Sequence, residues 1–135
     1  MRYSPYEHEY EAVISMTESE LLEYFLTRVF ETEEVWGLDD GAEWIMREQG
    51  AQASMPVWPY KKFASESAVG HWGGFNPQAE SLEEFLQNTI MVLIEENAML
   101  EVMPRQSEVG CLISPQKLKS ILDGMIEAGT YTMDG

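Results

Sequence analysis

Residues 53–59 read Ala-Ser-Met-Pro-Val-Trp-Pro, and this stretch decides the fold more than any other. We expect a β-strand over Ala53–Trp58. Proline has no backbone N–H to donate to a neighbouring strand, so Pro56 and Pro59 predict that this strand lies at the edge of a sheet or ends there. The tryptophan between the two prolines is expected to hold the strand end in place.

Two further short segments combine a tryptophan with turn-forming residues, so that these three segments contain three of the four tryptophans. Trp36-Gly37-Leu38 closes a short strand expected over Glu34–Leu38, and the turn Asp39-Asp40-Gly41 follows it. Glu43–Arg47 is expected to return as the hairpin partner of that strand. The third segment, Trp72-Gly73-Gly74, belongs to a glycine-rich loop.

Helix starts are marked by serine or threonine with a glutamate three residues later, or with proline at the first helical position. The hydroxyl accepts a hydrogen bond from a backbone N–H that the first helical turn leaves free. Apolar residues at helical spacing follow each start. These signals predict helices that begin at Ser4-Pro5, Thr17, Ser81 and Ser114-Pro115, and a short helix over Tyr60–Ala68.

The remaining segments complete an α+β fold. Met99–Met103 and Val109–Ile113 are expected to form a second hairpin, and Gly70–Pro77 a loop. Runs of strands between helices predict a mainly antiparallel sheet of about five short strands, with helices at the N-terminus, in the middle and at the C-terminus. We expect one domain, with an acidic helical pair over 1–33, an α+β core over 34–128 and a frayed tail over 129–135.

The net charge is strongly negative. The 135 residues include 24 Asp and Glu against 8 Lys and Arg, a formal net charge of -16. Such a surface repels nucleic acid and anionic membranes and favours basic protein partners. The alternative interpretation is that the charge only keeps the protein soluble. No apolar run approaches the about 20 residues that span a bilayer, and Cys111 is the single cysteine, so we expect a cytoplasmic protein.

No recognisable set of catalytic or metal-binding residues is present. His8 and His71 are far apart and Cys111 has no second thiol, so the spacing of a structural zinc site is missing. Cys111 alternates with Val109 and Ile113, which is typical of a small buried hydrophobic residue. We therefore predict no catalytic residue, no metal and no cofactor, and a protein that is not an enzyme.

The aromatic residues between positions 58 and 75 form the candidate binding surface. Tryptophan and tyrosine are common at binding hot spots because they desolvate large areas with little loss of entropy. The competing interpretation is that Trp58 and Trp72 hold an irregular loop onto the core. The candidate partner-binding residues are Trp58, Tyr60, His71, Trp72 and Phe75, together with Asp39 and Asp40.

Several motifs follow one another in an order that resembles a known family. The most specific is Pro56-Val57-Trp58-Pro59. The others are the string from Glu34 to Asp40, Phe63-Ala64, Trp72, Pro77, Leu82, Phe85-Leu86, Val102-Met103-Pro104 and Gly110–Pro115 with Leu118. Together they cover roughly two-thirds of the chain and resemble bacterial domain-of-unknown-function family 2750.

The resemblance implies a small cytoplasmic bacterial α+β protein and brings no established activity or catalytic residues. The chain departs from the family pattern at Met103-Pro104-Arg105, where Phe-Pro-Thr is expected. Its acidic N-terminal helices lie outside the shared part. These departures leave the expected fold unchanged.

Three functions stay open. The leading expectation is a non-enzymatic protein-binding module, in a narrower form an immunity or antitoxin-like inhibitor of a basic partner. The second is a small-ligand-binding protein or enzyme that uses a cleft near Trp36, Trp58 and Trp72. The third is a structural subunit whose aromatic patch is closed by formation of a homodimer.

Overall fold

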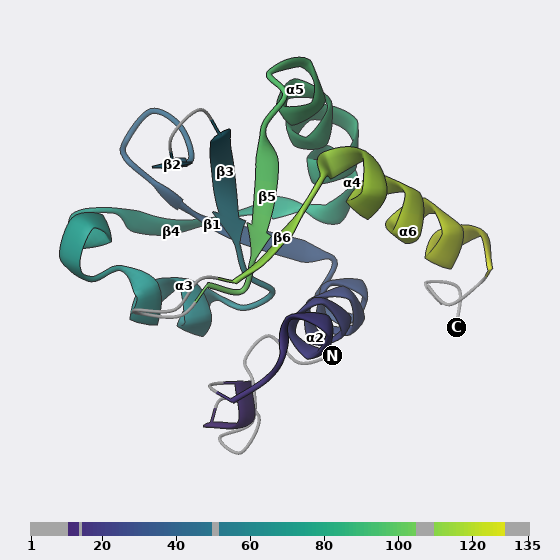
Figure 1. Ribbon diagram of the computed structural model, residues 1–135, viewed down its shortest axis with the longest axis horizontal. Helices are drawn as coiled ribbons and strands as arrows, with labels where there is room; N and C mark the ends of the chain where they lie inside the picture. The colour runs from purple at the N-terminus through teal and green to yellow at the C-terminus, as the bar shows by residue number, and fades with distance from the viewer. Residues whose placement is uncertain (1–10, 14, 50–51, 105–109, 129–135) are drawn as a thin grey trace.

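A computed structural model describes residues 11–13, 15–49, 52–104 and 110–128 (Figure 1). The helix expected at Ser4-Pro5, the predicted strand residue Val109 and the tail 129–135 lie outside the described residues. The elements are α2 (Glu18–Thr32), β1 (Glu34–Asp39), β2 (Arg47–Gln49), β3 (Gln52–Val57), α3 (Lys61–Ser67), η1 (Gly70–Trp72), β4 (Asn76–Ser81), α4 (Leu82–Glu84), η2 (Phe85–Thr89), α5 (Ile90–Glu95), β5 (Met99–Val102), β6 (Cys111–Ile113) and α6 (Pro115–Glu127).

The strands form two small sheets that meet at a pair of tryptophans. One sheet has the order β2-β3-β5-β6, and the other pairs β1 with β4. The Trp36 N–H donates to the Trp58 carbonyl at 2.8 Å, and the Trp58 N–H donates back at 2.9 Å. Figure 1 shows β1 and β4 crossing the upright strands β3 and β5. Trp36 and Trp58 therefore join the two sheets through their backbones.

The predicted α+β class is confirmed, with six described strands instead of about five. Three of the strand pairs are antiparallel, and β3 with β5 is parallel. The second hairpin is confirmed in the antiparallel pairing of β5 with β6. The short helix expected over Tyr60–Ala68 corresponds to α3, which has Tyr60 as its N-cap residue and Ala68 as its C-cap residue.

Of the two alternatives that the prolines predicted, the edge position is wrong, because β3 has β2 on one side and β5 on the other. The strand does end there, since Val57 is its last residue. The Val57 carbonyl accepts from the Met103 N–H at 2.9 Å on the β5 side. Backbone groups of successive residues face opposite sides, so the nitrogen of Pro56 faces away from β5. On that side the pairing with β2 ends at Ser54, and the pairing with β1 begins at Trp58. Pro56 lies in the gap between two partners, where no N–H is needed.

Strand β4 was not predicted: its first two residues were expected in the loop over Gly70–Pro77, and the next three were assigned to no element. The structure forms η1 at Gly70–Trp72 and then pairs β4 with the whole length of β1. The sequence Asn-Pro-Gln-Ala-Glu-Ser has no apolar alternation, so only the presence of the partner strand makes it a strand.

The hairpin partner expected over Glu43–Arg47 is only partly formed. Trp44 makes an isolated bridge with Asp39, and the Ile45 N–H donates to the Leu38 carbonyl at 2.7 Å. The strand itself begins at Arg47 and pairs with β3 instead of β1. The segment therefore turns from one sheet into the other.

The predicted helix starts at Thr17, Ser81 and Ser114 are confirmed. Each hydroxyl accepts from the backbone N–H three residues later, and Glu20 closes the capping box of α2. The helix after Ser81 runs from Leu82 to Glu95 as α4, η2 and α5, with a wider π turn at η2. We call this continuous stretch the central helix.

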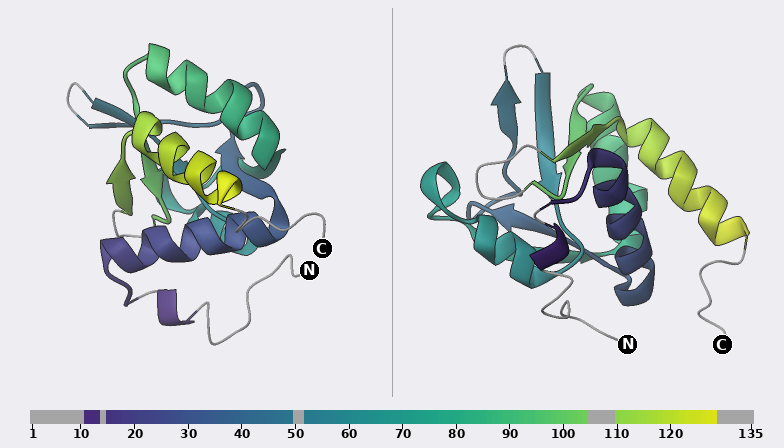
Figure 2. Two further views of the ribbon diagram at one scale, coloured as in Figure 1. Left: turned by 90° about the vertical axis from the view of Figure 1, so that its right-hand side faces the viewer. Right: turned by 60° about the horizontal axis from the view of Figure 1, so that its bottom comes forward.

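One hydrophobic core joins the helices to the sheets. Figure 2 shows α2, α6 and the central helix together on one side of the molecule. Leu21, Phe25 and Val29 of α2 are buried in the same cluster as Leu100 of β5 and Leu118 of α6. Helix α2 is thus part of the core and not a separate acidic attachment. Among the described residues, no helix is long and apolar enough to cross a membrane.

Candidate functional site

The structure divides the candidate aromatic residues between the core and the surface. Trp58 and Tyr60 are fully buried, so they have no surface to offer to a partner. Trp72 and Phe75 are half-buried and pack against the core. The side chain of His71 is not among those that the structure describes. A binding surface built from all five aromatic residues is therefore not present in this conformation.

Trp58 holds the loop after β5 and the segment around η1. Its Nε1 donates to the Pro104 carbonyl at 2.8 Å, and the Ser67 hydroxyl donates to the same carbonyl at 3.2 Å. The ring of Trp72 meets Trp58 edge to face, with ring centroids 6.1 Å apart. These contacts support the structural role of the two tryptophans.

An ion pair between the half-buried Arg47 and the buried Glu101 lies next to Trp72, and the sequence analysis did not find it. The Arg47 Nε donates to Glu101 Oε1 at 2.8 Å, and the Arg47 guanidinium carbon lies 4.7 Å from the Trp72 ring centroid. Glu101 is fully buried, and its Oε2 accepts from the Gly110 N–H at 3.0 Å. A glutamate inside the apolar strand Met99–Val102 was the signal that could have revealed it, because a buried carboxylate requires partners.

Asp39 and Asp40 shape the turn after β1. Asp40 Oδ1 accepts from the N–H groups of Ala42 at 2.9 Å and Glu43 at 3.1 Å. The hydrogen bonds from Glu43 and then Ala42 lower the pKa of the exposed Asp40 carboxyl. Asp39 Oδ1 accepts from the Gly41 N–H at 2.6 Å. Both carboxylates thus have a local structural role.

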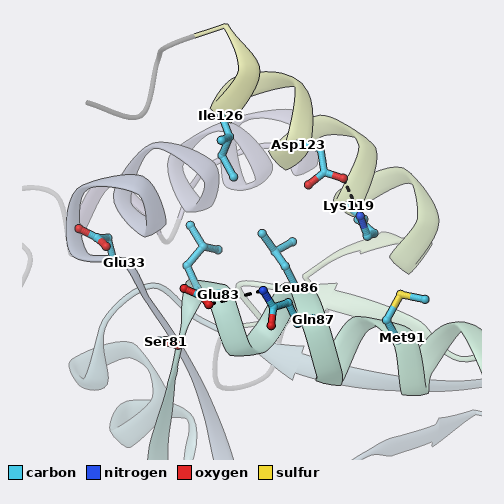
Figure 3. Close-up of a pocket in the computed structure, with 10 residues that line it drawn as sticks. Glu33, Ser81, Glu83, Leu86, Gln87, Met91, Lys119, Asp123 and Ile126 are labelled. Carbon is cyan, nitrogen blue, oxygen red and sulfur yellow. Dashed lines mark hydrogen bonds and ion pairs between the residues drawn. The ribbon is translucent and has the colours of Figure 1, made fainter. Parts of the chain in front are cut away.

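A groove of about 610 Å³ lies between α6 and the central helix, close to the end of α2 (Figure 3). In Figure 3, Ile126 projects from α6 toward the gap, and Leu86 projects into it from the central helix. We call this the helical groove; it is lined by Glu33, Ser81, Leu82, Glu83, Leu86, Gln87, Met91, Lys119, Asp123 and Ile126. Its volume is within the about 300–1,000 Å³ range of ligand pockets.

The helical groove has an apolar interior and an acidic rim. Met91 and Ile126 are 43% and 40% exposed, which is high for large apolar side chains. Asp123 accepts from the Lys119 ammonium at 2.6 Å, so the one cation of the lining is already paired. Glu33 and Glu83 add two further carboxylates.

The sequence analysis predicted both helices that form the helical groove but not the groove. The apolar stripes after Ser81 and Ser114 indicate which faces are buried. They do not indicate that α6 and the central helix diverge enough to leave Met91 and Ile126 uncovered. The space between two helices depends on tertiary packing, which no local pattern encodes.

The described side chains give no sign of a metal site. Nowhere in the described part of the chain are three His, Cys, Asp or Glu residues grouped so that they could hold a metal ion. Burial, and next the charge of Glu18, raise the pKa of the Cys111 thiol. The thiol is thereby kept in its protonated, less nucleophilic form.

Together these features define a small α+β protein with an acid-rimmed apolar groove between two helices. A family model described as "Protein of unknown function (DUF2750)" matches residues 22–122, so the chain belongs to that family. The match begins inside α2, so most of that helix belongs to the shared part. The comparison with curated proteins and the comparison with solved structures each found no match.

Proposed function

We propose that this protein is a non-enzymatic binding module whose helical groove receives a basic amphipathic segment of a partner protein. The observation that carries the proposal is the coincidence, in one groove, of uncovered apolar side chains with more carboxylates than the single Lys119 neutralises. An amphipathic helix laid into an apolar groove is a common mode of peptide recognition.

Charge supports a basic partner. The lining carries three carboxylates and one ammonium group, and the ammonium is paired with Asp123. The whole chain has a formal net charge of -16, which attracts a basic partner over a long range and speeds its encounter. The apolar interior, including Leu86, would then supply the short-range contact.

The test uses a synthetic amphipathic helix of lysine and leucine as the probe, followed by NMR chemical-shift mapping. We expect shifts at Leu86, Met91 and Ile126, and binding that weakens as salt is added. Met91→Gln and Ile126→Gln should each weaken binding, because they replace apolar contact with a polar group. Leu112→Gln is the matched control, since Leu112 is 44% exposed on β6 and does not line the groove.

Three results would contradict the proposal. One is equal weakening by the Leu112→Gln control. Another is binding of a glutamate–leucine helix as tight as that of the lysine–leucine helix. The third is a set of chemical-shift changes at residues outside the groove. Self-association of the protein would be one cause of such changes, and light scattering at two protein concentrations would reveal it.

A narrower form of the proposal is an immunity or antitoxin-like inhibitor that masks a basic partner in the cytoplasm. Tight inhibitors of basic enzymes use acidic surfaces for rapid and selective association. Affinity capture from the native host with a salt titration tests this form. Glu83→Gln, in the lining of the helical groove, should reduce capture of the partner, and Glu66→Gln on α3 is its control. A captured partner that is acidic, or that binds independently of salt, would rule out the inhibitor.

A further inference from the structure

A second hollow of about 530 Å³ lies on the opposite side of the central helix from the helical groove. The turn after β1, the strand β4 and the end of the central helix line this open hollow, together with Met46 and with Met55 of β3. We call it the Trp44 hollow; its lining is Asp39, Ala42, Glu43, Trp44, Met46, Met55, Gln78, Ala79, Glu80, Asn88, Thr89, Val92, Leu93 and Glu96.

Trp44 provides an aromatic wall that is held in position. A Cβ atom placed on Gly37 would lie 2.4 Å from Cε3 and 2.5 Å from Cδ2 of Trp44, so the indole lies directly against the Gly37 backbone. Trp44 is half-buried, and the hydrogen bond from the Ile45 N–H to the Leu38 carbonyl fixes its segment. Trp44 also lines the hollow, so the hollow has an aromatic side chain of fixed position in its wall.

The charge in the Trp44 hollow is of one sign. Asp39, Glu43, Glu80 and Glu96 line it, and no Lys, Arg or His is among the described residues of the lining. Glu80 accepts from the Thr89 hydroxyl at 2.6 Å, and Asp39 from the Gly41 N–H. Neither hydrogen bond neutralises the carboxylate that accepts it, so Glu80 and Asp39 keep negative charges with which a cationic ligand can pair.

The end of the central helix adds to the negative potential. Its last turn contains no basic residue, and Glu96 is the C-cap residue. The carbonyl groups at a helix C-terminus carry partial negative charge that cations stabilise. A cation in the hollow would take the place that a lysine or arginine usually has at such an end.

Apolar side chains lie between these charges. Met46, Met55 and Leu93 line the hollow, together with Val92, which is 49% exposed. Methionine sulfur is polarisable and adapts to the shape of a flexible ligand. An aromatic face that attracts cations, surrounded by aliphatic groups and carboxylates, favours an organic cation over a hydrated metal ion.

From these observations we propose that the Trp44 hollow binds a small aliphatic amine that carries two or more ammonium groups. One ammonium group lies against Trp44, the others pair with carboxylates, and the methylene chain covers the apolar side chains. Four carboxylates exceed what a single lysine side chain neutralises, which favours a free polyamine over a residue of a protein partner. This inference goes beyond the helical groove and does not depend on it.

The test is calorimetric titration of the full chain with putrescine and with spermidine, and the site is located by NMR. We expect saturable binding, with spermidine tighter than putrescine, and shifts at Trp44, Asn88 and Val92. Trp44→Phe should weaken binding by about threefold to tenfold through the smaller cation–π attraction. Glu96→Gln should weaken it by about twofold to fivefold, the scale of one exposed ion pair.

The matched control is Glu95→Gln, because Glu95 is exposed and adjacent in sequence but does not line the hollow. Equal weakening by Glu95→Gln and Glu96→Gln would overturn the proposal, since binding would then follow net charge alone. Displacement of putrescine by an equal concentration of Mg²⁺ would overturn it as well. Tighter binding of a lysine-containing peptide than of spermidine would also overturn the proposal, because the ligand of the hollow would then be a protein partner and not a free amine.

The Met91→Gln variant separates this site from the helical groove. If spermidine still binds Met91→Gln while the lysine–leucine helix does not, each site is established by its own ligand. Loss of both ligands in Met91→Gln would overturn the assignment of spermidine to the Trp44 hollow.

Discussion

Among the described glycines, Gly37 is the one at which an added Cβ atom would meet an aromatic ring, that of Trp44. An added methyl group at Gly37 would lie 2.4 Å from the ring, which is far inside van der Waals contact. We expect Gly37→Ala to lower the free energy of unfolding by about 1–3 kcal/mol, the usual cost of overpacking. Urea denaturation followed by circular dichroism measures the change.

Gly124 is the control for that substitution. A Cβ there meets no atom within 4 Å, and the residue lies inside α6. Gly124→Ala should raise the free energy of unfolding by about 0.5–1 kcal/mol, because alanine restricts the unfolded chain and favours the helix. If both alanine variants changed stability in the same direction, the steric explanation for Gly37 would be wrong.

The pair of the half-buried Arg47 and the buried Glu101 gives a second prediction for single residues. Arg47→Met leaves a buried carboxylate without its cation, and we expect a loss of about 3 kcal/mol. Glu101→Gln should cost less, because the amide is neutral and its oxygen can still accept from the Gly110 N–H. Urea denaturation at neutral pH compares the two variants, and a larger loss for Glu101→Gln would contradict this ranking.

Cys111 gives a prediction about pH. Burial and the charge of Glu18 raise the pKa of the thiol, so at a given pH the folded chain contains less thiolate than the unfolded chain. Alkylation by iodoacetamide should be slower in the folded chain, and its pH midpoint should be higher than in urea. Glu18→Gln should move the midpoint down, and the control Glu23→Gln should not.

Among the elements, α2 depends on its first turn. Thr17 and Glu20 form a reciprocal pair of hydrogen bonds, at 3.2 Å to the Glu20 N–H and 2.9 Å to the Thr17 N–H. Thr17→Ala should lower the free energy of unfolding by about 1 kcal/mol, the typical value for a lost N-cap. Ser19→Ala, in the same turn but outside the cap, is the comparison; an equal loss there would mean that the cap is not the cause.

The central helix contributes side chains to both hollows. Leu86 and Gln87 line the helical groove, and the next two residues, Asn88 and Thr89, line the Trp44 hollow. All four belong to the π turn η2. A π turn inserts an extra residue into the helical repeat and redirects the side chains that follow, which is one reason why such turns are frequent at functional sites.

On the scale of the whole molecule, the formal net charge of -16 opposes compactness. Added salt screens this repulsion, so the melting temperature should rise by about 2–5 °C between low salt and roughly 0.5 M sodium chloride. Differential scanning calorimetry checks the shift, with potassium chloride as a control for specific ion effects. A fall in melting temperature would mean that ion pairs, not repulsion, dominate the electrostatic energy.

Local signals predicted local structure well. The starts of α2, α4 and α6 followed from Thr17, Ser81 and Ser114, because a cap satisfies the backbone within a few residues of itself. Strand β4 and the interior position of β3 did not follow, because a strand is defined by a neighbour that can be distant in the chain. The same limit applied to the sites. The burial of the Glu101 carboxylate is explained by its ion pair with Arg47, which is 54 positions away in the sequence.

The sequence by itself determined the α+β class, the helix starts, the family and the negative charge, because composition, caps and apolar spacing act over short distances. Only the tertiary structure decided that Trp58 is internal and that β3 has partners on both sides. It also decided that Gly37 makes room for Trp44 and that two hollows open on opposite sides of the central helix. These features arise where segments far apart in the chain pack together, and packing geometry depends on all of those segments at once.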